Sequence, residues 1–194
     1  MSGVRRFAQW GLWFGGALVF LAALLIGVDV LLRKFMARSI GGADELAGYA
    51  LAIGTAWGLG AALLDRAHIR IDSLYVLFPL RLRLALDIVA LMLLVGFFAL
   101  IAWHGSGVVA QSWTSGSRSQ SALETPIVIP QVVWIAGLVV FVAIGIVLLV
   151  DAVRILVSGD PRSAARLIGT RSAEEEVEDE IRDLKDRRVR EGSG

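Results

Sequence analysis

The stretch from Asp44 to Asp72 reads DELAGYALAIGTAWGLGAALLDRAHIRID. Its part from Leu46 to Leu64 contains no charged residue, and these nineteen residues, at about 1.5 Å each in a helix, cover roughly 28 Å, close to the thickness of the hydrocarbon core of a bilayer. The segment can cross a membrane only as a helix, because lipid offers no partner to backbone polar groups. The stretch therefore predicts a transmembrane helix with an acidic start and a polar end.

The composition of the whole chain points the same way. Of its 194 residues, 56% are hydrophobic, and the mean hydropathy is +0.70. The net charge of +1 gives no nucleic-acid signature, and the absence of cysteine excludes disulfides, thiol catalysis and Cys-ligated metals. Long apolar runs predict an all-α integral membrane protein with four transmembrane helices, over residues 7–32, 46–64, 84–103 and 132–156.

Basic residues suggest the orientation, because they gather on the cytoplasmic side of membrane helices. A model with both termini in the cytoplasm places most of them there: Arg5, Arg6, Arg66, Arg70, Arg81, Arg83, Arg154, Arg162 and Arg166. Arg33, Lys34 and Arg38 in the first loop argue against it. We expect residues 66–83 to lie along the cytoplasmic interface. Residues 158–194 should form a charged cytoplasmic tail with a helix over 172–190.

Ionisable side chains near the ends of the spans form three candidate pairs at helical spacing. These pairs are Asp29 with Arg33, Arg83 with Asp87, and Asp151 with Arg154. Buried charges in membrane helices are candidates for function, but pairs near helix ends also anchor a bundle. The two histidines, His68 and His104, fall at opposite sides of the predicted membrane domain and cannot hold a haem together. We expect no catalytic residue, no metal and no cofactor.

Glu45 differs from these pairs, since no basic residue follows one turn later on its own helix. A carboxylate in the first turn is favoured by the helix dipole, which gives a capping role. The alternative is an ion pair with Arg33, Lys34 or Arg38, or with a partner subunit. The sequence leaves both open.

Small residues recur at four-residue spacing on the first two spans. The positions are Gly11, Gly15, Ala23 and Gly27 on the first span, and Ala50, Gly54, Gly58 and Ala62 on the second. Helices in lipid associate through close packing, which such rows permit. The pattern favours a protein whose task is to pack against other helices.

Several short motifs follow one another in a specific order. They are Leu32-Arg33-Lys34-Phe35, Glu45-Leu46-Ala47, Gly58-Leu59-Gly60-Ala61-Ala62, His68-Ile69-Arg70-Ile71-Asp72, Leu77-Phe78-Pro79, and Thr125-Pro126 with Pro130. In this order, over about residues 7–157, the chain resembles the small membrane subunit, the DctQ-like small permease, of tripartite ATP-independent periplasmic (TRAP) transporters. The tail from Ser158 is longer than the resemblance leads us to expect.

The resemblance implies a non-catalytic, multi-pass subunit of the bacterial inner membrane. Such subunits pair with a large permease, which carries the substrate and sodium sites, and work with a periplasmic solute-binding protein in sodium-driven uptake of organic acids. We expect no substrate site here and no nucleic-acid partner. The candidate contacts with the large permease are Arg33, Glu45, Ala50, Gly54, Gly58, Ala62, Arg66, His68, Arg70 and Asp72.

Two other functions fit the same four spans. A dimeric exporter of small molecules would need an essential membrane-buried carboxylate, for which Asp29, Glu45 and Asp87 are the candidates. An assembly subunit of another membrane complex would need none. The chain lacks the internal inverted repeat and broken helices from which transport sites are commonly built, and this favours a scaffold.

Overall fold

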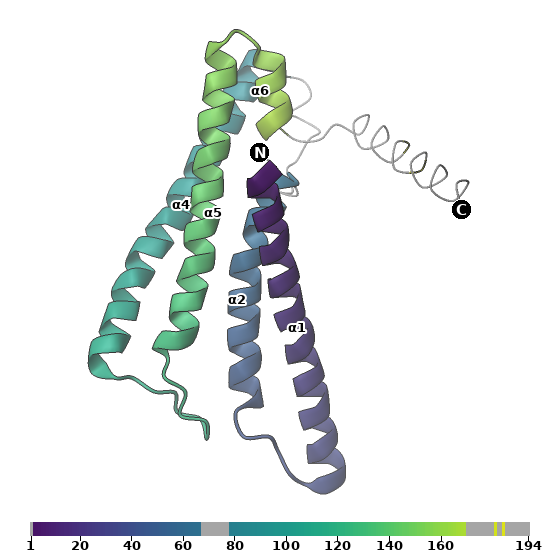
Figure 1. Cartoon of the computed structure of the whole chain (residues 1–194), viewed down its shortest axis with the longest axis vertical. Helices are drawn as coiled ribbons and strands as arrows, with labels where there is room; N and C mark the ends of the chain where they lie inside the picture. Colours follow the sequence, from purple (N-terminus) through teal and green to yellow (C-terminus); the bar gives the residue numbers. More distant parts are fainter. Residues whose placement is uncertain (1, 67–77, 170–180, 182–183, 185–194) are drawn as a thin grey trace.

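The computed structural model describes residues 2–66, 78–169, 181 and 184, and this part of the chain is built from helices (Figure 1). The helices are α1 (Ser2–Met36), α2 (Ala43–Leu64), α4 (Leu80–Ser115), α5 (Val128–Val157) and the short α6 (Pro161–Ile168). Four of them, α1, α2, α4 and α5, are long and apolar enough to cross a membrane. The predicted all-α membrane protein with four transmembrane helices is confirmed.

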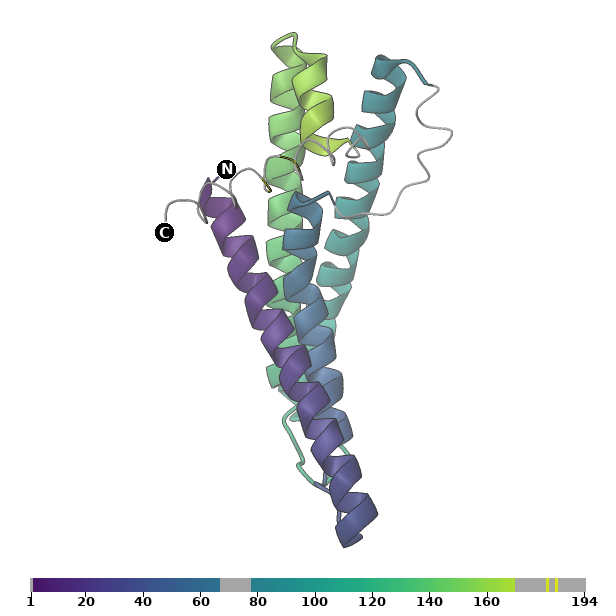
Figure 2. The same ribbon diagram turned by 90° about the vertical axis from the view of Figure 1, so that its right-hand side faces the viewer.

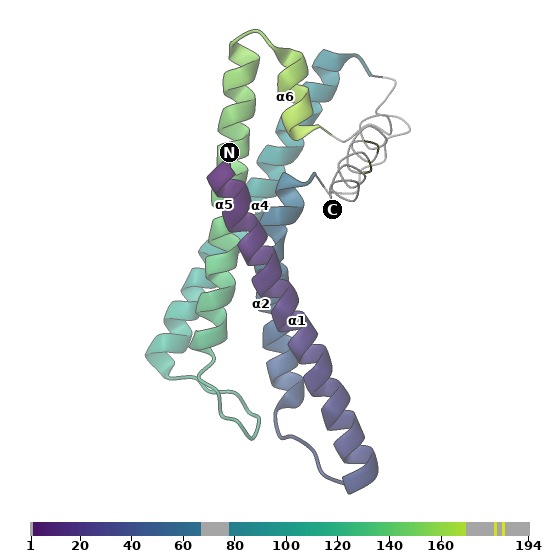
Figure 3. The same ribbon diagram turned by 45° about the vertical axis from the view of Figure 1, so that its right-hand side comes forward.

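The long helices form two hairpins. In one hairpin α1 packs along α2, in the other α4 packs against α5, and the two hairpins meet where α2 packs on α5. The N-terminal part of α1 crosses over α5 (Figure 3), while the same part of α1 diverges from α2 (Figure 2). The short helix α6 folds back onto α4 and α5, at the end of the bundle that also holds the N-terminus (Figure 1).

The buried core lies toward this same end. Phe141 of α5 is fully buried, and its ring meets that of Phe98 of α4 with 4.6 Å between centroids. Phe141 belongs to an apolar cluster to which all five described helices contribute, with Ala8, Ala61, Leu91, Ile144, Leu148 and Ala164 among its members. The opposite end contributes little to this cluster, so other contacts must hold the two hairpins together there.

The outer faces of α1 and α4 are apolar and exposed. The most exposed side chains include Trp10 and Trp13 near the start of the first predicted span, Trp103 at the end of the third, and Trp113 near the end of α4. Such faces are unfavourable in water but suit lipid, and tryptophan is common where lipid meets water. The surface of the bundle therefore agrees with a membrane protein.

The helices run beyond the predicted spans. Helix α4 continues through residues 104–115, which hydropathy had left outside the span, and ends only at Gly116 in the left-handed conformation (φ 61°). At its start, Arg81 and Arg83 lie in the first turn of α4 rather than in a loop. Hydropathy detects only the apolar part of a helix, so it does not predict the turns that extend beyond the lipid.

The C-terminal segment also differs in detail from the expectation. Residues 161–168 were expected within the charged tail, but they form α6, which buries Ala164 and Ile168 against the bundle. The predicted helix over 172–190 and most of the predicted interfacial loop, residues 67–77, lie outside the described residues. The packed part of the protein thus extends at least to residue 169.

Candidate partner-binding site

The small residues of α1 and α2 pack against one another within the chain. A Cβ atom on Gly15 would lie 2.5 Å from the carbonyl oxygen of Gly54, and one on Gly11 would lie 2.9 Å from that of Trp57. Gly58 also faces α1, since its Cβ would lie 3.8 Å from the Leu12 side chain. Glycine permits this approach of two backbones, and the resulting contact holds α1 on α2. Gly54 therefore serves the contact between α1 and α2.

Trp57 joins three helices at this crossing. Its indole Nε1 donates a hydrogen bond of 3.0 Å to the carbonyl oxygen of Val133 in α5. Its ring contacts Phe14 of α1 edge to face, with 5.6 Å between centroids, and lies 2.8 Å from where a Cβ on Gly137 would be. A buried indole normally finds such a partner for its N–H group. Trp57 therefore fixes α2 between α1 and α5.

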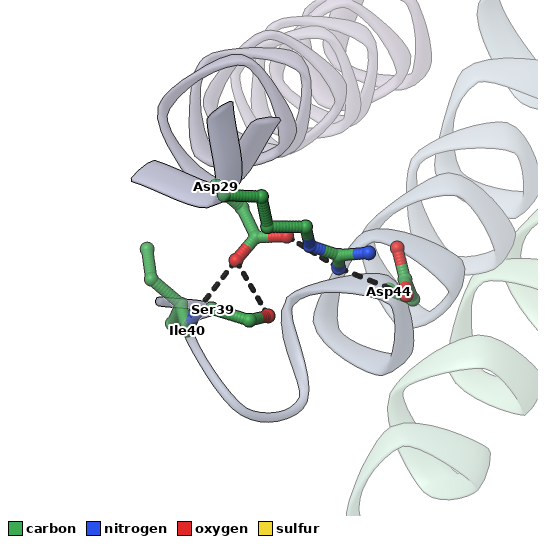
Figure 4. A network of polar contacts seen from close by, with 5 residues as sticks. Asp29, Ser39, Ile40 and Asp44 are labelled. Atoms are coloured by element: carbon green, nitrogen blue, oxygen red, sulfur yellow. Dashed lines mark hydrogen bonds and ion pairs between the residues drawn. The ribbon is translucent and has the colours of Figure 1, made fainter. Parts of the chain in front are cut away.

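A polar network closes the hairpin of α1 and α2 at the end away from the N-terminus (Figure 1 and Figure 4). The carboxylate of Asp29 is 1% exposed and accepts hydrogen bonds from the Ser39 hydroxyl (2.9 Å) and the Ile40 amide (2.6 Å). Arg33 forms an ion pair with Asp29 and a second, of 3.5 Å, with Asp44. The predicted pair of Asp29 and Arg33 is thus confirmed, and it binds the turn as well as the helix.

Glu45 binds the loop between α4 and α5, residues 116–127. It accepts a hydrogen bond from the hydroxyl of Ser121, and the hydroxyls of Tyr49, Ser119 and Thr125 lie around the same carboxylate. The expected place in the first turn of α2 is confirmed. The alternative of an ion pair with Arg33, Lys34 or Arg38 is wrong, because among the described residues none of these joins Glu45, and contact with a partner subunit stays a prediction.

The α4–α5 loop is folded rather than simply extended. The Ser119 amide donates to the Thr125 carbonyl (2.9 Å), and the Ile127 amide donates to the Ser117 carbonyl (3.2 Å). Its tip rests on the turn between α1 and α2, where Leu123 leaves no space for a Cβ on Gly42. Gly42 has a φ of 92°, a conformation that glycine adopts readily. The loop thus connects the two hairpins at the end that the core does not reach.

Contacts at the opposite end fix α6. Asp160 caps its start by accepting a hydrogen bond of 3.0 Å from the Ser163 amide. Just beyond its end, the Gly169 carbonyl accepts a hydrogen bond of 3.5 Å from Arg66, and the buried Asp87 carboxylate lies close by. Arg66, predicted as a partner contact, therefore reaches a group of its own chain.

Only some of the remaining predicted contacts belong to the residues that the structure describes. Ala50 and Ala62 are half-buried on α2, as is Gly58. His68, Arg70 and Asp72 lie outside the described residues.

No ion pair joins Asp151 to Arg154 in the part of the chain that the structure describes. No described group of three or more His, Cys, Asp or Glu side chains is placed to hold a metal ion.

Together these features define a class: a four-span membrane protein with charged residues near helix ends, several of which bind the chain's own loops and turns. A family model described as tripartite ATP-independent periplasmic transporters, DctQ component, matches residues 9–155. The chain therefore belongs to the DctQ family, the small permease component of TRAP transporters, and the resemblance in sequence is confirmed. Comparison with curated proteins and with solved structures gave no match.

Membership of this family settles two further points. DctQ proteins are components of a transporter and not enzymes, so the prediction that the chain is not an enzyme is confirmed. Proteins of this family work in general with a large permease and a periplasmic binding protein.

Proposed function

We propose that the chain is the small membrane subunit of a TRAP transporter in the bacterial inner membrane. It holds the large permease in position for sodium-coupled uptake of an organic acid that a periplasmic binding protein delivers. The family match over residues 9–155 carries the proposal. The placement of the described charges near helix ends supports it, because a transport path through this chain would need polar groups deep in the membrane.

The proposal puts both termini in the cytoplasm. The start of α1, the start of α4 and helix α6 share one end of the bundle (Figure 1), and Arg5, Arg6, Arg81 and Arg83 belong to these segments. Arg33 lies at the other end, where its pairs with Asp29 and Asp44 give it a structural role. An alkaline phosphatase fused to the C-terminus should be inactive in cells, and an active fusion would contradict this orientation.

Purification of the tagged full chain from its native membranes in mild detergent tests the central claim. We expect a large multi-span permease to co-purify in a constant ratio and to be identified by mass spectrometry. A homodimer without other subunits would favour the exporter, and subunits of a respiratory or secretion complex would favour the assembly role. Either result would overturn the proposal.

Reconstitution tests the transport step. Liposomes that contain the chain and the large permease should take up the organic acid only with the binding protein outside and an inward sodium gradient. Omission of the chain should reduce uptake at least tenfold, although the permease is still inserted. Unchanged uptake without the chain would contradict a role in positioning the permease.

A further inference from the structure

A groove of about 410 Å³ opens among α2, α4 and α5 on the surface of the bundle. Helix α5 packs against both α2 and α4 and forms its base. Residues that line the groove include Gly48, Ala52, Thr55, Phe98, Ile101 and Trp134. Its lining is almost entirely apolar, so in a membrane it accepts either lipid or an apolar helix.

Four of the six α2 residues that line this groove are small, and the other two are Leu51 and Leu59. A Cβ atom on Gly48 would meet nothing within 4 Å, and Ala52 and Thr55 are exposed. The Thr55 hydroxyl donates to the Leu51 carbonyl (2.7 Å), which satisfies its polar group within α2. Unlike the glycines at the α1 contact, these residues leave the backbone of α2 open to the close approach of another helix.

A second groove of about 410 Å³ adjoins the first, because Ile101 and Trp134 line both. His104 and Gln131 also line this second groove. The side-chain oxygen of Gln131 is buried and has no hydrogen-bond partner in the described part of the chain. An unpaired buried polar atom is costly. The site therefore lacks one hydrogen-bonding group from outside the described residues.

We propose that the two grooves together receive one transmembrane helix of the large permease, and that a side chain of this helix hydrogen-bonds to Gln131. The inference rests on the proposed function. Small residues for close packing and a polar side chain for an interhelical hydrogen bond are the two features that join helices in lipid, and here they line adjoining grooves. A lipid acyl chain would fill the apolar volume but would leave Gln131 unpaired.

Photo-cross-linking in native membranes tests where the permease helix lies. The cross-linking amino acid benzoylphenylalanine would replace Ala52 in the groove or, as a control, Ala23 on the exposed outer face of α1. We expect the Ala52 variant to become linked to the permease and the Ala23 variant to react with lipid. Linkage from Ala23 alone, or only lipid adducts from Ala52, would overturn the inference. Co-purification of the wild-type chain with the permease would still uphold the proposed function.

Two matched glycine substitutions measure how far binding depends on the groove. Neither Gly48 nor Gly27 has an atom within 4 Å of a Cβ position, so leucine fits the chain itself at both. We expect Gly48→Leu to reduce co-purified permease at least tenfold and Gly27→Leu to leave it unchanged. Size-exclusion chromatography of each variant confirms that the subunit is folded. Equal binding by both variants would contradict the proposal.

The role of Gln131 is tested by Gln131→Leu, which keeps the size of the side chain but removes both polar groups. If a permease side chain bonds to Gln131, the substitution should reduce co-purified permease severalfold, because it leaves the permease group unpaired. The stability of the subunit alone should not fall, since no described group bonds to the buried oxygen. Unchanged binding together with unchanged stability would show that no partner group reaches this site.

Discussion

The two hairpins of this protein are held together in different ways. In the first, glycines bring the backbones of α1 and α2 into contact, and the Asp29 network closes the turn. In the second, α4 and α5 interlock through larger side chains, such as Phe98 against Phe141, and leave a groove with an unpaired Gln131. The Asp29 carboxylate of the first hairpin has partners within the chain, whereas among the described residues one buried oxygen of Gln131 in the second hairpin, like one of Glu45 in α2, has none. Stability thus rests on the side of α2 that faces α1, whereas the proposed partner groove uses another side of α2 together with α4 and α5.

Disruption of the glycine contact in the first hairpin should have the largest effect on the stability of the protein. Gly15→Leu would place a side chain where a Cβ already lies 2.5 Å from the Gly54 carbonyl oxygen, and neither backbone can yield without separating the helices. We expect a loss of about 3 kcal/mol in the free energy of unfolding. The midpoint of thermal unfolding in detergent measures it.

The neighbouring residue provides the control. A Cβ on Gly16 meets nothing within 4 Å, so Gly16→Leu should leave stability unchanged or raise it slightly through its better helix propensity. If the two variants unfold at the same temperature, the contact between α1 and α2 does not hold the first hairpin.

Disruption of the Asp29 network should lower the stability of the protein less. Asp29→Ala would leave the Ile40 amide without its acceptor and remove one of the two carboxylates that pair with Arg33. We expect the unfolding midpoint to fall by several degrees, because the partly buried Ile40 amide loses its partner, although the half-exposed Arg33 can be rehydrated.

Asp44→Ala is the matched control for this network. It removes the other carboxylate that pairs with Arg33, but the side chain of Asp44 is 81% exposed and its contact is 3.5 Å. Exposed ion pairs contribute little to stability, so the midpoint should hardly change. Equal effects of the two substitutions would mean that the turn, residues 37–42, does not depend on the buried carboxylate.

Sequence alone predicted those features of the fold that depend on regular spacing of residues along one helix. The four apolar runs predicted the four spans, and the four-residue rows of α1 and α2 identified Gly15 and Gly54 as packing residues, although Gly54 was predicted to contact the large permease and packs against α1. The spacing of Asp29 and Arg33 gave their ion pair. Each of these signals is local, because one helix places residues four apart on the same face.

Contacts between distant segments were not predicted, because no local spacing encodes them. Nothing near Glu45 in the sequence indicates Ser121, which lies 76 residues away and reaches it only after α4 and α5 have packed. Likewise, the row on α2 did not reveal that Gly54 faces α1 while Gly48 and Ala52 face an open groove. Which side of a helix meets which neighbour is decided by the tertiary fold.

Loss of the hydrogen bond between Glu45 and Ser121 should have the smallest effect on stability. Its effect on dynamics should be confined to the α4–α5 loop. Glu45→Ala frees the α4–α5 loop from α2 but leaves the core and the contact between α1 and α2 intact. We expect faster hydrogen exchange at the amides of Ser119 and Ile127, with little change in the unfolding midpoint. Glu124→Ala, in the same loop but with an exposed side chain, should exchange like the wild type. If Glu45→Ala instead destabilises the whole protein, the loop contributes to the global fold as strongly as the contact between α1 and α2, and the assignment of stability mainly to that contact is wrong.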